Sequence, residues 1–264
     1  LSLHPVTQVP MPNSTLLSQL NLPLSLVSGL PPEIRDGLLA HLQTWGEPDE
    51  TLAVVDALRT AHGPLLFLLD IQAAELLRAN HSEQALEVVE RRQRRSTTAI
   101  SQALEARALL ATGHHEHARQ VAEDLVTAYP RNATVIAGAA SVLAQVGQFE
   151  PAVAALEKVL AARQGDVTAT LAMAQIQHRA GRFADADLFA QRLGAGVPPS
   201  ISDEQLGQLA ALVEQLGKEQ SAQALRTELE RRRLMQREQL ARQLTPFVAG
   251  DPALAADSSV LYHR

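Results

Sequence analysis

The sequence of 264 residues contains no cysteine, few aromatic residues and no long apolar run. Without cysteine the chain can form no disulfide, no thiolate metal site and no Cys–His nucleophile. Aromatic residues make up 3% of the chain and hydrophobic residues 46%, so a core must be built mainly from Ala, Leu and Val. These small and aliphatic side chains favour closely packed helices, because strands favour β-branched and aromatic residues.

The charge balance and the hydropathy pattern exclude two kinds of interaction. The net charge of −6 at pH 7 argues against non-specific binding of nucleic acid, whose phosphates attract basic surfaces. No run of about 18 apolar residues occurs, so we expect no transmembrane segment in this chain. The first residue is Leu1 rather than Met, so we expect an excised fragment or a processed product. The compartment stays open between the cytoplasm, slightly favoured, and a periplasmic or envelope-associated location.

A fixed spacing of glycine and alanine runs through the middle of the chain. Gly113, Gly147 and Gly181 are evenly spaced, and an alanine lies at the same short distance after each of them. A constant period of about 34 residues predicts helix–turn–helix units that stack into a solenoid. A helix readily ends at glycine in the left-handed conformation, so each of these glycines marks a turn.

Apolar residues at three- and four-residue spacing predict helix pairs around these turns. Asn80 takes the place of glycine one period before Gly113, to within a single position, and Gly46 lies one full period before Asn80. A long helix over about 219–245 ends the series, and its polar composition suits the open face of a stacked array. The earlier pairs cover about 32–45 with 48–61, 65–79 with 82–94, 98–112 with 115–128, 132–146 with 149–163, and 166–180 with 183–193.

The phased small residues resemble tetratricopeptide repeats, in which two helices cross at small side chains and a glycine forms the turn. Taking Gly113, Gly147 and Gly181 as the turns, the small residues of the first helices are Ala106, Ala140 and Ala174, and those of the second helices are Ala118, Ala152 and Ala186. The family places an aromatic residue two positions after the turn, where this chain has His115, Phe149 and Phe183. The closing proline of the family is present as Pro130 and Pro198, with Gln164 in the middle unit.

This resemblance implies an all-α fold, a right-handed α-solenoid of stacked antiparallel helix pairs with about six tetratricopeptide units. We expect the solenoid at 32–236, with units at about 32–64, 65–97, 99–132, 133–166, 167–200 and 203–236. Residues 237–264 then extend the last helix and form a C-terminal tail.

Residues 1–31 form an uncharged arm before the solenoid. Residues 1–32 hold six prolines and nine leucines but no Asp, Glu, Lys or Arg. The prolines exclude a long helix and favour extended or turn conformations. Two interpretations fit the arm. It is either a linker or a segment lying along its own solenoid, or it contacts another chain, which includes self-association, or the remainder of a longer protein.

In the family that the chain resembles, the first helices line a concave surface that faces a bound peptide. The residues carried over by position are Arg78, Arg107, Gln145, Gln175, His178, Arg179, Leu77, Leu110 and Leu171. Such a mixture suits an extended peptide or a helix with some acidic character, although a merely solvated surface fits as well. Members that grip a C-terminal carboxylate use Lys, Asn and Arg at early positions, and the chain departs from that clamp with Asp36, Ala40, Asp70, Ala74 and Ala103.

Motifs that carry chemistry are missing from the sequence. It contains no glycine-rich phosphate loop and no Gly-x-Ser-x-Gly nucleophile elbow. His114, His115 and His117 could bind a metal, but zinc sites on helices normally use i, i+4 spacing, so exposed or structural histidines are the favoured interpretation. The arginines of 91–95 and 231–233 suit solvated helix ends and pairs such as Glu228 with Arg232, with an acidic partner as the alternative. We therefore expect no metal, no cofactor and no catalytic residue.

The sequence thus favours a non-enzymatic scaffold or adaptor that binds a protein or peptide partner in its concave groove, as a module of a larger protein or assembly. The alternative is a regulatory or sensor module that binds a peptide or small ligand and controls an attached effector domain. An enzyme is the third class, without a supporting motif. The partner, the pathway and the oligomeric state do not follow from the sequence.

Overall fold

The computed structural model describes residues 15–20, 22–63, 65–194 and 197–248, and the regular elements within these ranges are all helices. The chain divides into two compact units. The first unit consists of residues 1–63 with 237–264, and the second of residues 64–236. The long helix α14 (Glu219–Val248) begins in the second unit and ends in the first. The expected division into an arm, a six-unit solenoid and an extension stays a prediction.

The first unit contains two four-residue helices and one longer helix pair. They are α1 (Leu16–Gln19), α2 (Leu24–Val27), α3 (Pro32–Trp45) and α4 (Pro48–His62). Both longer helices begin with proline in the first turn, where its missing N–H and fixed φ cost nothing.

The described part of the arm packs against its own unit. The backbone N–H of Leu17 donates to Glu50 Oε1 of α4 at 2.6 Å, and α2 contacts α4. Val27 and Leu30 are at most 1% exposed. Residues 15–20 and 22–30 therefore follow the first of the two interpretations, that of a segment lying along its own chain. Residues 1–14 lie outside the described residues, and self-association through the arm stays a prediction.

The turn between α3 and α4 differs from the one that the constant spacing suggests. Gly46 has an extended conformation, with φ −81° and ψ 163°, and its N–H donates to Leu42 O at 2.7 Å. A Cβ at Gly46 would lie 2.7 Å from the same oxygen, so glycine is needed here for clearance. Because Gly46 is not left-handed, it is not the equivalent of the later turn glycines.

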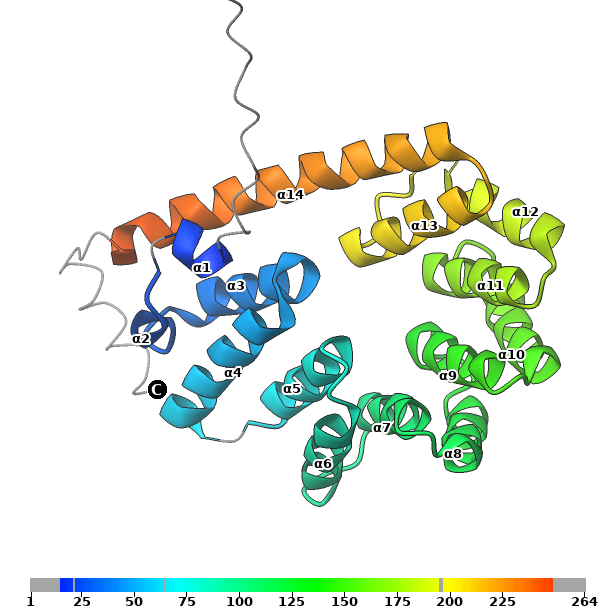
Figure 1. The fold of residues 1–264 in the computed structure, drawn as a ribbon, viewed down its shortest axis with the longest axis horizontal. Coiled ribbons are helices and arrows are strands. Elements are labelled where there is room, and N and C mark those ends of the chain that lie inside the picture. The colour runs from blue at the N-terminus through cyan, green and yellow to red at the C-terminus, as the bar shows by residue number, and fades with distance from the viewer. Residues whose placement is uncertain (1–14, 21, 64, 195–196, 249–264) are drawn as a thin grey trace, which may run out of the picture. The chain divides into compact units, whose positions relative to one another are not determined.

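The second unit repeats one helix pair with little variation (Figure 1). Within each of the first four pairs the two helices contact each other, and the first helices of successive pairs also contact one another. The observed bounds agree with the expected ranges to within a few residues. The pairs are α5 (Leu66–Arg78) with α6 (Ser82–Gln93), α7 (Ala99–Ala111) with α8 (His115–Ala128), α9 (Ala133–Gln145) with α10 (Phe149–Ala162), and α11 (Val167–Arg179) with α12 (Phe183–Gly194), followed by α13 (Asp203–Gln215) and α14.

One turn geometry closes the first helix of every pair in this unit. At the third turn Gly147 has φ +85°, and the N–H of Gln148 donates to Leu143 O at 2.8 Å. This backward bond is the Schellman motif, which pairs a carbonyl that the helix end leaves without a partner. The left-handed residues at the five turns are Asn80, Gly113, Gly147, Gly181 and Gly217, with φ between 60° and 85°. The left-handed conformation expected of the turn residues is thus present.

The small residues of the period are buried where the helices of a pair meet. Ala106, Ala140 and Ala174 of the first helices are all 0% exposed. The alanines of the second helices, Ala85, Ala118, Ala152, Ala186 and Ala222, are also 0% exposed. Two helices approach closely only where neither presents a large side chain. These alanines therefore allow the two helices of each pair to pack against each other.

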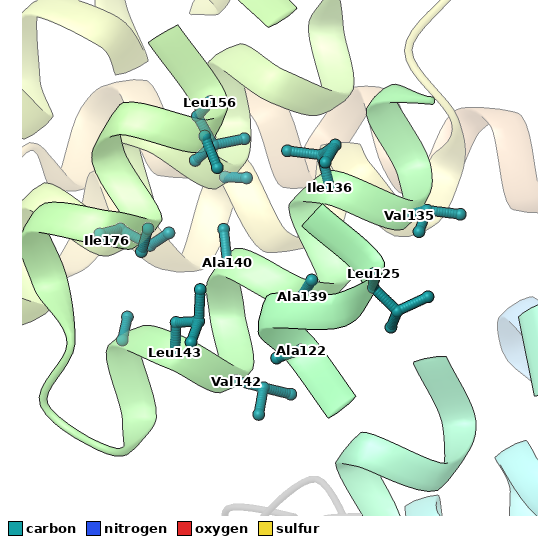
Figure 2. Packing of buried hydrophobic residues seen from close by; sticks show 14 of the residues in the cluster. Ala122, Leu125, Val135, Ile136, Ala139, Ala140, Val142, Leu143, Leu156 and Ile176 are labelled. Atoms are coloured by element: carbon teal, nitrogen blue, oxygen red, sulfur yellow. The ribbon is translucent and has the colours of Figure 1, made fainter. Parts of the chain in front are cut away.

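The core of the second unit is made of aliphatic side chains around α9. Figure 2 shows Val135, Ile136, Ala139, Ala140 and Leu143 of α9 among neighbours from α8, α10 and α11. Helix α9 carries no charged residue and buries side chains on most of its circumference, as a helix enclosed by neighbours does.

The position two residues after the turn is less buried than the family resemblance suggests. Phe149 is half-buried, whereas His115 is exposed and Phe183 is 57% exposed. The Phe183 ring meets His178 edge to face, with ring centroids 5.2 Å apart. His115 therefore does not pack at the position where the family has an aromatic residue.

The first part of α14 packs on the end of the second unit. Ala222 and Leu225 join the core cluster of α11 to α13, and Arg232 Nη1 donates to Asp203 Oδ1 at 3.2 Å. In the first unit, Leu240 and Leu244 are buried, and Arg237 donates to Gln19 Oε1 at 3.1 Å. The helix runs through Pro246 to Val248, slightly beyond the expected end.

Candidate functional site

A groove of about 530 Å³ follows the exposed faces of four successive first helices, α7, α9, α11 and α13. A second hollow of about 370 Å³ adjoins it and shares Ser141, Ala172, Gln175 and Gln208 with it. The floor of the groove, meaning the helix surfaces that line it, includes several residues with small side chains, which leave space above them. They are Ala103, Ala137, Gly138, Ser141 and Ala172. A Cβ built on Gly138 would meet no atom within 4 Å, so the space above this residue is open.

The groove gathers six of the nine residues expected at a concave binding surface. Arg107, Gln145, Leu171 and Gln175 line the larger hollow, and Gln175, His178 and Arg179 line the smaller one. Leu171 is only 2% exposed, so it belongs mainly to the core beneath the groove. The polar members keep accessible side chains and remain candidates for partner contact.

The other three expected residues line neither hollow. Arg78 is an exposed residue whose Nη1 lies 3.1 Å from Glu75 Oε2 in the same helix. Leu110 is half-buried and packs against the core around α9, and Leu77 is half-buried in α5. These residues contribute to the packing and charge balance of α5 and α7, and their role as partner contacts stays a prediction.

The period points to two rows of groove residues, of which only Arg107 and Gln175 were predicted from the sequence. The residue six positions before each turn is Arg107, Ser141 and Gln175 in successive first helices. The residue thirteen positions before the turn gives a second row on the groove, which consists of Ile100, Thr134, Thr168 and Glu204. Serine, threonine and glycine carry no distinctive chemical signal by themselves, so only the phase identifies them.

Side-chain amides join neighbouring helices across the groove. Gln175 Nε2 of α11 donates to Gln208 Oε1 of α13 at 3.2 Å, and Gln208 Nε2 donates to Glu204 Oε1 of the same helix at 3.2 Å. Gln205 Nε2 donates to Thr168 Oγ1 at 2.8 Å. Each amide has further donor and acceptor capacity, so the wall can pair with the N–H and C=O groups of a bound chain.

Two arginines of the groove are free to meet a ligand. Within the described ranges, neither Arg107 nor Arg179 makes an ion pair or a side-chain hydrogen bond, and both are exposed. Glu204 supplies the negative charge at the α13 end. The groove is therefore positive over α7 and α11 and negative over α13.

A buried carboxyl lies in α5 of the same unit. Glu75 is 2% exposed, and Arg78 Nη1 donates to its Oε1 at 3.3 Å. Burial raises the pKa of Glu75 from 4.5 to about 7; the charge of Arg78 opposes this rise, and that of Glu204 adds to it. Glu75 is thus a group that titrates near neutral pH.

The histidine cluster forms no ligand set for a metal. His114, His115 and His117 are exposed, and His114 Nδ1 lies 2.9 Å from Thr112 Oγ1. Throughout residues 15–20, 22–63, 65–194 and 197–248, no group of three or more His, Asp or Glu side chains lies close enough to hold a metal ion. The exposed interpretation of these histidines fits the structure.

The two arginine clusters are largely engaged in pairs within the chain. Arg92 is 5% exposed and holds Asp70 through two bonds, Nε to Oδ1 at 2.8 Å and Nη2 to Oδ2 at 3.1 Å. In α14, Arg232 Nε donates to Glu228 Oε1 at 3.0 Å, which is the intrahelical pair expected from the sequence. Neither cluster is a continuous row of unpaired cations.

No family model matches the chain, and no curated protein matches it. Among solved structures, a tetratricopeptide repeat protein from Parabacteroides merdae is 16% identical, with coverage of 80% of this chain and 91% of that chain and a TM-score of 0.46. A thermophilic tetratricopeptide repeat protein of Thermus thermophilus is 19% identical, with coverage of 69% and 100% and a TM-score of 0.49. PilW, a type IV pilus biogenesis factor, is 16% identical, with coverage of 76% and 94% and a TM-score of 0.49.

Because these identities and scores are low, the fold is recognised from the chain's own helix pairs, turns and phased alanines. They define an all-α helical repeat of the tetratricopeptide type, the kind of fold that serves as a scaffold for protein–protein interaction. In the described part of the chain, no helix has the length and apolar character needed to cross a membrane.

Proposed function

We propose that the protein is a non-enzymatic scaffold or adaptor that holds a segment of a partner protein in the groove over α7, α9, α11 and α13. Fold alone does not assign a function, so the proposal depends on the site. The single observation that carries it is a low floor of small residues around Gly138, walled by amide and hydroxyl side chains from successive helices. A groove lined by four successive first helices offers contacts along the length of a polypeptide segment.

The chemistry of the walls favours a polypeptide as the bound group. Gln145, Gln175 and Gln208 offer both donors and acceptors, which is what a peptide backbone requires along its length. The donors and acceptors come from three rigid helices rather than from loops, so they are positioned before the partner arrives and little ordering entropy is lost on binding.

A steric block at Gly138 tests the proposal. We expect Gly138→Trp to fill the centre of the groove and to weaken peptide binding at least about tenfold, since an indole would occupy the path of the chain. Gly138→Ala is the matched control, because a methyl group meets no atom within 4 Å and alanine favours a helix over glycine by about 0.5–1 kcal/mol. The probe is a display library of random twelve-residue peptides, and the enriched peptides are then measured by fluorescence anisotropy.

The outcome separates a binding groove from a solvated surface. Peptides that bind the wild-type chain and Gly138→Ala but not Gly138→Trp would support the proposal, provided that both variants keep the wild-type helix content and cooperative melting. Equal binding to the tryptophan variant would rule out the groove. A selection that enriches no peptide at all would contradict the proposed function itself.

A further inference from the structure

The distribution of charge in the groove carries an inference about the partner. We propose that the groove takes an extended acidic peptide, with one carboxylate at Arg107 and a second at Arg179, about six residues apart. The inference rests on the proposed function and adds to it the conformation, the charge and the spacing of the bound segment.

Within the described residues, the guanidinium groups of Arg107 and Arg179 lack partners. Arg78 pairs with Glu75, Arg92 with Asp70 and Arg119 with Glu116, whereas Arg107 and Arg179 have no such pair among the described residues. Both lie on the groove, on α7 and α11. Guanidinium groups bind carboxylates through paired N–H donors, so an incoming acidic side chain would satisfy each of them.

The distance between Arg107 and Arg179 suits two side chains of one extended peptide. Helices α7, α9 and α11 contact one another in sequence, and neighbouring packed helices have axes about 8–10 Å apart. Arg179 also lies one helical turn beyond Gln175, which is the counterpart of Arg107 in α11. The path between the two side chains is therefore about 20 Å, which an extended chain spans with about six residues at roughly 3.3 Å each.

The groove is uncharged between the two arginines and carries a carboxylate on α13. The floor between them carries Gly138, Ser141 and Gln175, which are uncharged and leave room for a backbone. An exposed carboxylate, Glu204, follows at the α13 end and would repel a third acid there. Acidic side chains of the bound peptide are thus favoured over α7 and α11 and disfavoured over α13.

The α7 end of the groove adds an apolar contact next to the first arginine. Ile100 is 60% exposed, and with the buried Leu104 it lines the groove one and two turns before Arg107. An exposed isoleucine beside a cation suits an apolar side chain next to the first acid. The bound segment is accordingly apolar and acidic at its α7 end, neutral in the middle and acidic again at α11.

Synthetic peptides of defined charge test this inference. The probes are fluorescein-labelled peptides of about twelve residues with one leucine, two aspartates and a neutral background of serine, threonine and alanine. The peptides with the widest spacing are lengthened to about sixteen residues, so that the two aspartates can be placed about three, six or thirteen positions apart, and a further peptide replaces both aspartates with asparagine. Affinities are measured by anisotropy at low and high salt against wild type, Arg107→Gln, Arg179→Gln and the double variant.

The control is a double variant, Arg91→Gln with Arg94→Gln, which removes the same charge from exposed positions on α6 and at its end, outside the groove. We expect the peptide with a spacing of six to bind best and to lose roughly 3- to 10-fold in affinity for each groove arginine removed, as partly exposed charge pairs do. Its binding should weaken with salt, while that of the asparagine peptide should not. The control should leave both unchanged.

Each other result overturns the inference in a recognisable way. A best spacing of about thirteen would mean a helical ligand, because a helix rises only about 1.5 Å per residue. Equal affinity for the aspartate and asparagine peptides, or an equal loss in the Arg91 and Arg94 control, would remove the acidic partner. If library peptides still depend on Gly138 in that case, the groove remains a peptide site and only its charge preference is wrong.

Discussion

At the residue scale, small side chains determine both the architecture and the site. The alanines at the helix crossings and the left-handed turn glycines are easily found in the sequence because they recur with one period. The same period identifies the groove, but there it passes through Ser141, Thr134 and Gly138, whose chemistry is too common to be noticed alone. The residues with a strong sequence signal, the histidine cluster and the arginine clusters, are instead exposed or already paired.

Burial also contributes information that no pattern in the sequence contains. An acidic residue such as Glu75 would ordinarily be assigned to solvent, yet this one is buried. Leu171 and Leu110 were expected on the binding surface because of their phase; Leu171 lines the groove but is almost fully buried in the core, and Leu110 packs against the core. A hydrophobic residue at the edge of a helix face can point into the core or toward solvent, and packing with the next helix pair decides between the two.

Glu75 makes the stability of the protein depend on pH. Its pKa is about 7 in the folded protein and near 4.5 in the unfolded chain, so the folded state holds the proton more tightly between these values. Stability is therefore highest when the carboxyl is protonated, and it falls as the pH rises through this window. We expect wild type to lose about 1–3 kcal/mol between pH 4.5 and pH 8 relative to Glu75→Gln, which keeps the shape and lacks the charge.

Urea unfolding at a series of pH values measures this difference. Glu83→Gln, on the exposed face of α6, is the control and should shift the free energy of unfolding by a similar small amount at every pH. If the curves of wild type and Glu75→Gln stay parallel from pH 4.5 to pH 8, then folding does not raise the pKa of Glu75.

At the scale of the element, the helices are specified by local signals that agree with one another. Thr98 and Ser202 begin α7 and α13 with capping boxes, and Asn132 and Asp166 cap α9 and α11 with their side chains. These caps satisfy N–H groups that the helix itself cannot pair. The sequence therefore predicts where the helices start and stop to within a few residues. The exception is Gly46, whose role depends on the carbonyl of Leu42 and not on φ.

The pair of Arg92 and Asp70 links α6 to α5 and should matter for the stability of that helix pair. Replacing Arg92 with Leu leaves the largely buried carboxylate of Asp70 without its cation, and we expect a loss of about 2–4 kcal/mol in the free energy of unfolding. The double variant Asp70→Ala with Arg92→Leu should recover part of that loss, because no uncompensated charge remains.

Chemical denaturation of the four members of this double-mutant cycle measures the coupling. Arg91→Leu is the control one residue away, where the side chain is exposed and the change should stay within about 0.5 kcal/mol. Additive losses for Asp70→Ala and Arg92→Leu would show that the ion pair contributes nothing to the stability of α5 and α6.

At the scale of the whole molecule, the division into units was the least accessible to sequence analysis. The first compact unit combines residues 1–63 with residues 237–264, which are at opposite ends of the chain. No local sequence pattern predicts that these two segments belong to one unit. The grouping depends on the position of the end of α14, whereas its amino-acid composition indicates only that it is a polar helix. The polar composition of this helix predicts that it is exposed, which is correct for much of its length, but Leu240 and Leu244 are buried.

Removing residues 237–264 should affect the first unit selectively. The shortened chain lacks Leu240, Leu244 and the bond from Arg237 to Gln19, while the core around α9 keeps all its contacts. We expect the amides of α3 and α4 to exchange with solvent at least about tenfold faster, with the amides of α7 to α11 unchanged.

Hydrogen exchange followed by mass spectrometry measures both regions in one experiment, so α7 to α11 act as the internal control. Unchanged exchange in α3 and α4 would mean that the first unit holds together without the C-terminal part of α14. Uniformly faster exchange across the chain would instead indicate one cooperative structure.

The Schellman turns have an evolutionary consequence. Each is closed by bonds between residues close together in the chain, and none depends on the neighbouring pair. A tandem duplication of the codons from Gly113 to the residue before Gly147 would therefore add a self-contained module whose two flanks already match. Lengthening the array by one such pair requires a copying error in the gene and no redesign of any fold.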